Sequence, residues 1–175
     1  MNSSQKFNFK LAERFLEDWA DPPEDPLGEL SHFEMGWRSF CFEYNHKVLI
    51  EIGDAQKEVF LDPDICMMME SNLPLEIAEL SQGKPIEIEF GESWFTIILL
   101  PIDNKINCTL IKFGTSCWEK QFELDRAQVL DALRGFLTEV MQLAVDKGFI
   151  TAEEKEEFVT AAFSAGNIDA VAIAQ

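Results

Sequence analysis

Positive charge is scarce in this chain. Lysine and arginine total 14 against 32 aspartates and glutamates, so the formal net charge is −18 and the pI is about 4.3. Such a charge repels phosphate backbones and anionic membrane surfaces, which argues against nucleic-acid and membrane binding. It keeps a protein soluble, and it also steers basic partners toward the surface. Both interpretations stay open.

Long apolar runs are missing as well. No stretch approaches the roughly 18 residues that a membrane span needs, and FTIILLPI ends at Pro101. The N-terminal MNSSQKFNFKLAERF is polar and mixed in charge, unlike a signal peptide. We therefore expect a cytoplasmic protein.

The sequence offers little to catalysis or to metals. Its two histidines, His32 and His46, stand in no zinc-binding pattern, and the glycines form no phosphate-binding loop. No GxSxG motif occurs, although a catalytic triad can assemble in space from distant residues. The cysteines form no CxxC pair, and we expect all four to be free, buried thiols: Cys41, Cys66, Cys108 and Cys117. We expect no cofactor, no metal and no catalytic residues.

Apolar residues, by contrast, are plentiful. They make up 47% of the 175 residues and include 15 Phe and 4 Trp, which is enough for a large core. The run DICMMME, residues 64–70, raises the question of a soft-metal site. Consecutive helix residues point about 100° apart and cannot converge on one ion. We therefore interpret Cys66 and the three methionines that follow it as core.

The first half of the chain predicts a helix and three strands. Leu11, Phe15, Leu16 and Trp19 have helical spacing, which predicts a helix of about a dozen residues starting near Asn8. WRSFCFEY, KVLIEIG and EVFLD then read as an antiparallel meander, with turns at 45–46 and 53–54. Residues 64–82 are helical but interrupted before Pro74, with Asp62 or Asp64 as the cap.

The second half predicts four more strands and two helices. KPIEIEF, SWFTIILLPI, KINCTLIKF and SCWEKQFEL are joined by short turns, so they must be antiparallel, with SWFTIILLPI a central strand. Asp125 and Gln128 form a capping box that starts a helix over 126–147 with a broad apolar stripe. Thr151 and Glu154 start a shorter acidic helix. The apolar tail IDAVAIAQ follows.

One loop concentrates acidic residues. Between Glu17 and Trp37 there is no lysine or arginine. Such a run is typical of a solvated loop, and it also suits docking of a basic partner. The candidate partner-binding residues are Asp21, Glu24, Asp25 and Glu29.

The order of elements resembles a known family. The helix LPLEIAELSQG, the hairpin pair IEIEFGESWFTIILLPIDNKINCTLIKFG and the join FELDRAQVLDALRGFLTEV are similar to the WapI-type bacterial immunity proteins. The resemblance covers about residues 33–147 and implies a non-catalytic protein that neutralises a toxin domain by binding it. It carries over no binding residue.

Together these patterns predict an α+β fold with about seven antiparallel strands in two meanders, forming one curved sheet or two packed sheets. The long helix should lie across the sheet, with further helices at both ends of the chain. We expect one domain over 1–148 and a helical appendage over 149–175. The expected function is non-enzymatic binding of a basic protein. The alternatives are a small-molecule binder or enzyme using the concave sheet face, and a subunit that self-associates through its tail.

Overall fold

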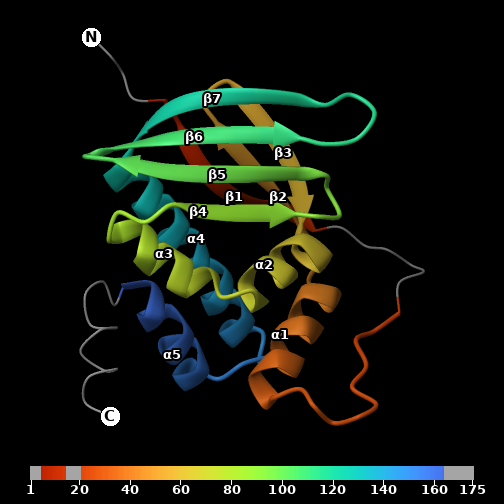
Figure 1. Ribbon diagram of the computed structural model, residues 1–175. Coiled ribbons are helices and arrows are strands. Elements are labelled where there is room, and N and C mark those ends of the chain that lie inside the picture. The colour runs from red at the N-terminus through yellow and green to blue at the C-terminus, as the bar shows by residue number, and fades with distance from the viewer. Residues whose placement is uncertain (1–4, 15–20, 164–175) are drawn as a thin grey trace.

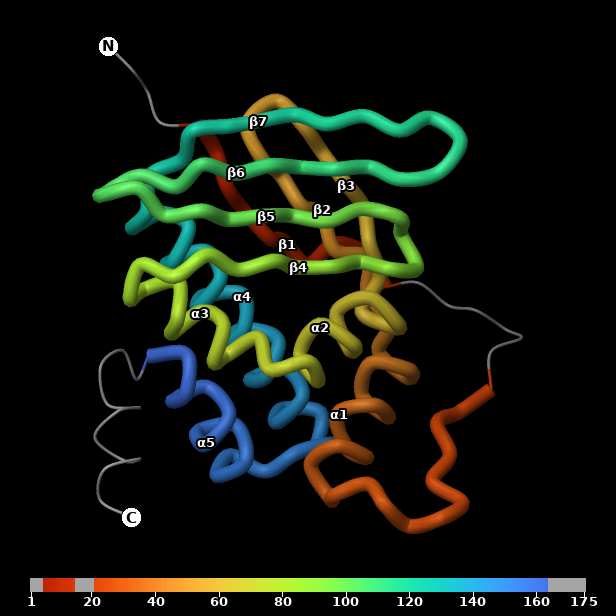
Figure 2. The backbone as a smooth tube through the Cα atoms, viewed as in Figure 1, coloured from red at the N-terminus to blue at the C-terminus, as the bar shows by residue number. Residues whose placement is uncertain are grey.

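The computed structural model describes residues 5–14 and 21–163 of the chain (Figure 1). These residues form an α+β fold with one three-stranded and one four-stranded antiparallel sheet. Figure 2 shows the strands of the smaller sheet running steeply behind those of the larger one. The sheets meet at Gly53, where a Cβ atom would lie 2.5 Å from the ring of Phe122.

The smaller sheet has the order β1-β2-β3, with β1 at Phe7–Arg14, β2 at His46–Ile52 and β3 at Ala55–Phe60. The helix predicted from Asn8 is therefore wrong over the described residues, and the rest of it lies outside them. Phe7 and Phe9 alternate inward and pair with Ile52 and Ile50, so strand pairing prevails over the helical spacing further along.

The predicted strand WRSFCFEY is a helix, α1 (His32–Glu43). Ser31 and Glu34 form a capping box at its start, which satisfies two amides that a helix end leaves free. Trp37, Phe40 and Cys41 share one face at i, i+3 and i+4, and all three are fully buried. The expected seven strands in two meanders are thus matched in part, because α1 separates β1 from β2.

The four strands predicted in the second half are confirmed, in the order β4-β5-β6-β7. Their bounds are β4 Ile86–Phe90, β5 Phe95–Ile102, β6 Lys105–Lys112 and β7 Trp118–Asp125. The alternating inner side chains, such as Ile88, Ile97, Cys108 and Phe122, all belong to the core. These side chains fill the inner face of the sheet.

Between the sheets the chain is helical and interrupted, as predicted. A short π-helical turn, η1 (Leu61–Ile65), leads into α2 (Cys66–Glu70) and α3 (Leu73–Ser81). Asn72 breaks the path with a φ of 71°, and Pro74 occupies the first turn of α3. Asp64 is buried and accepts hydrogen bonds from Phe60 N at 3.2 Å and Ser93 Oγ at 2.8 Å.

Two further helices complete the described chain: α4 (Arg126–Asp146) and α5 (Ala152–Phe163). Both predicted helix starts are correct, and Thr151 and Glu154 bond reciprocally in a complete capping box. The Asp125 carboxylate accepts from Gln128 N at 3.0 Å, but Gln128 Oε1 has no partner among the described residues, so only half of that predicted box forms. The apolar face of α4 packs against the smaller sheet, where the Phe9 and Phe136 rings lie 5.4 Å apart. The boundary predicted near residue 148 stays a prediction.

Three of the four cysteines are buried free thiols, as predicted, and Cys117 is exposed. Cys117 follows the loop after β6, where its Sγ donates to the Gly114 carbonyl at 2.9 Å. Burial raises the pKa of the Cys108 thiol to about 12, which keeps it protonated. The run DICMMME is largely core, since Cys66, Met68 and Met69 are buried, whereas Met67 is 55% exposed.

Candidate protein-docking surfaces

Residues 21–31, the part of the acidic loop that the structure describes, form a turn before α1. Gly28 N donates to the Asp25 carbonyl at 3.2 Å, while the Asp25 carboxylate accepts from Glu29 N at 2.9 Å and Leu30 N at 3.1 Å. Gly28 has a φ of +64°, a conformation that glycine adopts readily. The loop therefore holds its shape through its own hydrogen bonds.

The four predicted partner-binding residues have different roles in this loop. Asp25 is half-buried and used by the turn, whereas Asp21, Glu24 and Glu29 are exposed. Leu27 at the tip is 78% exposed, so the loop presents one apolar side chain among carboxylates. The structure brings the four residues into one loop and leaves the predicted docking role untested.

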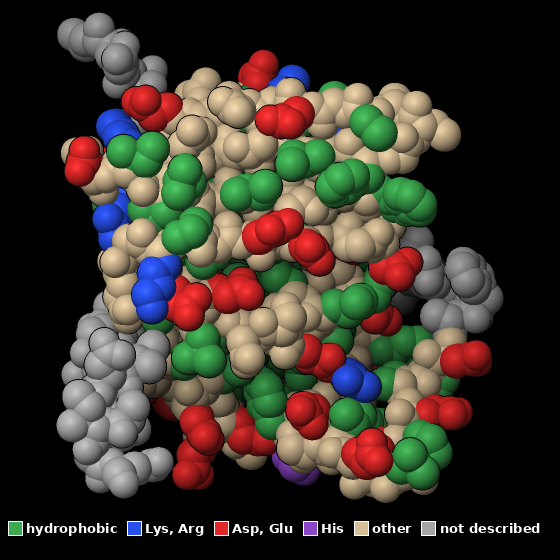
Figure 3. Space-filling view, in the orientation of Figure 1, with side chains coloured by type: hydrophobic (Ala, Val, Ile, Leu, Met, Phe, Trp, Pro, Cys, Tyr) green, Lys and Arg blue, Asp and Glu red, His purple; other side chains and the backbone are tan. Residues whose placement is uncertain are grey.

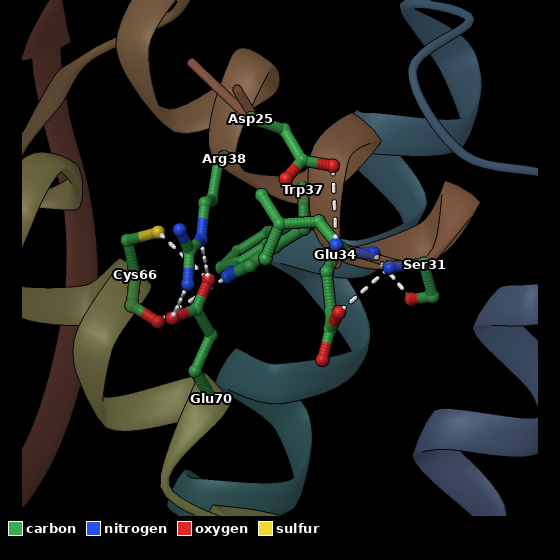
Figure 4. A network of polar contacts seen from close by, with 8 residues as sticks. Asp25, Ser31, Glu34, Trp37, Arg38, Cys66 and Glu70 are labelled. Carbon is green, nitrogen blue, oxygen red and sulfur yellow. Dashed lines mark hydrogen bonds and ion pairs between the residues drawn. The ribbon is translucent and has the colours of Figure 1, made fainter. Parts of the chain in front are cut away.

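A polar network fixes α1 behind this loop (Figure 4). The Arg38 guanidinium donates to both carboxylate oxygens of Glu70 on α2, at 2.6 Å from Nε and 3.1 Å from Nη2. Hydrogen bonding to Glu70 raises the pKa of Arg38. Trp37 Nε1 donates to the Cys66 carbonyl at 3.4 Å. The Trp37 contact thus joins α1 to the start of α2, and the Arg38 contact joins it to the end of α2.

The larger sheet provides a second surface, which the sequence did not reveal. Its outer face, seen in Figure 3, carries apolar side chains among polar and acidic ones. The register places Ile98, Leu100 and Ile102 on the outer side of β5, opposite Thr109, Asn107 and Lys105 of β6. Ile111 of β6 also points outward, opposite Thr96 and diagonal to Ile98. Leu100 is 43% and Ile102 53% exposed, so SWFTIILLPI is buried on one face only. We call Ile98, Leu100, Ile102 and Ile111 the apolar stripe.

Carboxylates flank the apolar stripe on both sides. Glu87 and Glu89 point outward from β4, where Glu87 pairs with Ile98. Across β6, Glu119 and Glu123 point outward from β7. All four are exposed. The outer face therefore combines an apolar row on β5 with acidic edge strands, while Asn107 and Thr109 of β6 lie between that row and β7. An apolar centre with a polar rim is the pattern of interfaces in protein complexes.

The described residues contain no group of three or more His, Cys, Asp or Glu side chains placed to hold a metal ion. Each of the two histidines makes a polar contact within the protein. His32 Nδ1 lies 3.3 Å from Glu154 Oε2, and His46 Nδ1 lies 3.0 Å from the Ala12 carbonyl. Burial raises the pKa of Asp64, whose Oδ1 has no hydrogen-bond partner among the described residues.

In comparisons with known proteins, no family model, no curated protein and no solved structure matches the chain. The resemblance to WapI-type immunity proteins thus stays a prediction. Across the residues that the structure describes, no helix combines the length and apolar character of a membrane span.

Proposed function

We propose that the protein binds a basic protein partner through the outer face of its larger sheet. The observation that carries the proposal is the apolar stripe between two rows of carboxylates. The chain has −18 net charge, and Glu87, Glu89, Glu119 and Glu123 place part of that charge beside apolar groups. A partner with an apolar ridge flanked by lysine or arginine complements this surface, because its apolar groups face the apolar stripe and its positive charges face the carboxylates.

The two parts of the surface have different roles in binding. Covering an exposed leucine or isoleucine contributes about 1.5–3 kcal/mol at full burial, so Leu100 and Ile102 supply affinity. The exposed carboxylates are screened by salt and act mainly on the association rate and on the choice of partner. We therefore expect binding that weakens, without vanishing, as salt is raised.

The acidic loop is a second contact in this proposal. Its carboxylates Asp21, Glu24 and Glu29 are exposed around Leu27, and the turn is already formed. A preformed loop loses little conformational entropy on binding. If the resemblance to immunity proteins holds, the partner is a basic toxin domain, and neutralisation follows from covering its functional surface.

The alternative of a ligand site on the concave sheet face has less support. Core side chains of the larger sheet, such as Ile97, Leu99 and Cys108, are fully buried on that face. The tail proposed for self-association lies outside the described residues. Neither alternative has an observation in its favour comparable to the apolar stripe.

A synthetic amphipathic helix of leucine and lysine tests the proposal, with a leucine–glutamate helix as the control peptide. Two triple variants remove equal charge: Glu87→Gln, Glu89→Gln, Glu119→Gln on the sheet, and Asp21→Asn, Glu24→Gln, Glu29→Gln in the loop. We expect the sheet variant to bind the basic peptide about tenfold more weakly by fluorescence anisotropy, with a smaller effect of the loop variant. Equal losses in both variants would mean that charge alone attracts the peptide, and the sheet-face proposal would be dropped.

A further inference from the structure

Three lysines gather around Trp118, where the edges of the two sheets meet. Lys57 on β3 lies with its Nζ 4.6 Å from the centre of the Trp118 ring, and Lys120 on β7 lies 5.6 Å from it. Lys112 on β6 pairs directly with Trp118 in the sheet register. The cluster therefore draws its members from both sheets.

The cluster brings three positive charges close together. None of the three lysines forms an ion pair with a carboxylate of residues 5–14 or 21–163, whereas Lys6 and Lys47 each do. Burial lowers the pKa of Lys57, and the charges of Lys112 and Lys120 lower it further. What sets the cluster apart is that three ammonium groups of like charge gather at one ring, with no carboxylate ion pair among the described residues, so their charge is available to an anion.

An open hollow of about 520 Å³ adjoins the cluster and shares Lys112 with it. Trp94 and Phe113 line the hollow and are 61% and 48% exposed, and Ser93 and Ser116 add hydroxyl groups. Trp94 has a φ of +60°, a strained conformation for a bulky residue, and its carbonyl accepts from Phe113 N at 2.8 Å. Such strain is concentrated at functional sites.

We propose that this end of the larger sheet binds a small organic anion that carries a planar ring, of the nucleotide class. The lysines hold its phosphate groups, and the exposed faces of Trp94 and Phe113 hold its ring. Ammonium groups bind phosphate as point charges, and aromatic side chains stack on planar rings. The site is separate from the apolar stripe, so this proposal does not depend on the proposed docking function and is tested independently of it.

Protection of sheet edges is the competing explanation. Inward-pointing lysines on edge strands prevent aggregation, and Lys57 and Lys120 lie on the edge strands β3 and β7. That role does not account for Lys112, because β6 is an inner strand of its sheet. Nor does it account for the exposed rings of Trp94 and Phe113.

Calorimetric titration with ADP, pyrophosphate and adenosine, without divalent metal, tests the proposal. We expect ADP to bind at least about tenfold more tightly than either fragment, because it engages both halves of the site. The variant Lys57→Gln, Lys112→Gln, Lys120→Gln should bind ADP at least about tenfold more weakly. A charge-matched control, Lys10→Gln, Lys84→Gln, Lys105→Gln, should retain ADP affinity.

A second variant keeps the test decisive if the triple variant does not fold. Trp94→Asn alters an exposed residue, and asparagine tolerates positive φ. It should weaken ADP binding and leave pyrophosphate binding unchanged. Absence of ADP binding at millimolar concentration, or ADP binding that both lysine variants retain equally, overturns the proposal. Pyrophosphate binding as tight as ADP binding overturns the assignment of the ring.

Discussion

Arg38 and Glu70 form a bidentate ion pair that joins α1 to the end of α2, with Nε and Oε1 2.6 Å apart. The pair is partly exposed, with 37% of the Arg38 and 26% of the Glu70 side chain accessible. It connects the helix that follows the acidic loop to the helical segment between the two sheets. The acidic loop is thereby anchored to the core.

A double-mutant cycle measures this connection. We expect Arg38→Met and Glu70→Gln to show a coupling of about 0.5–1 kcal/mol in urea unfolding, since exposed ion pairs contribute little and a bidentate geometry contributes more. Additive effects of the two substitutions would show that the pair does not stabilise the fold.

Two adjacent methionines should respond differently to truncation. Met68 is 4% exposed and Met67 is 55% exposed. We expect Met68→Ala to lower the free energy of unfolding by about 2–5 kcal/mol, because it leaves a cavity, and Met67→Ala to change it by less than about 0.5 kcal/mol. Equal effects in thermal unfolding would contradict the core assignment of the run DICMMME.

Two helical glycines provide a similar contrast. A Cβ atom on Gly36 of α1 would collide with the backbone carbonyl of Phe149, whereas a Cβ atom on Gly135 of α4 meets nothing within 4 Å. Gly36→Ala should therefore destabilise the protein by about 1–3 kcal/mol. Gly135→Ala should stabilise it by about 0.4–1 kcal/mol through helix propensity and chain entropy. Chemical denaturation of both variants checks the opposite signs.

Asp64 should make stability depend on pH. Burial raises the pKa of its carboxyl above the ordinary value that it regains on unfolding. The ionised form therefore costs stability above the folded-state pKa, and this cost disappears as pH falls through that pKa. The free energy of unfolding of Asp64→Asn, relative to that of the native protein, should therefore be higher near pH 7 than near pH 4.

Urea unfolding of Asp64→Asn at both pH values tests this sign, with Asp54→Asn as a control that removes one charge from an exposed turn. An Asp64→Asn variant whose free energy of unfolding rises relative to that of the native protein as pH falls would contradict the buried carboxyl with a raised pKa.

The sequence predicted the elements whose signals are local. Strict alternation in KPIEIEF, short turns between the four strands, and the residues at the starts of α4 and α5 each determine the structure within a few positions. The capping signal of α1 was equally local, in Ser31 and Glu34, but the alternation of WRSFCFEY concealed it. Strand β1 was missed because its partner β2 lies more than 30 residues away, beyond α1.

The candidate surfaces were predictable to different degrees. The acidic loop is continuous in sequence, so its charge could be recognised at once. SWFTIILLPI was correctly predicted as a central strand, but its sequence cannot show that one face of the sheet stays uncovered, so the apolar stripe was not predicted. The lysine cluster depends on Lys57 approaching Trp118 from another sheet, which only the tertiary structure reveals.

The central claim is that the apolar stripe binds the partner, and replacing its exposed residues tests it most directly. Leu100 and Leu75 are both 43% exposed, while Ile102 and Phe163 are 53% and 54% exposed, so the second residue of each pair is a matched control. We predict that Leu100→Gln with Ile102→Gln weakens binding of the basic amphipathic peptide at least about tenfold, while Leu75→Gln with Phe163→Gln leaves it unchanged. Equal affinities of the two double variants would contradict the account.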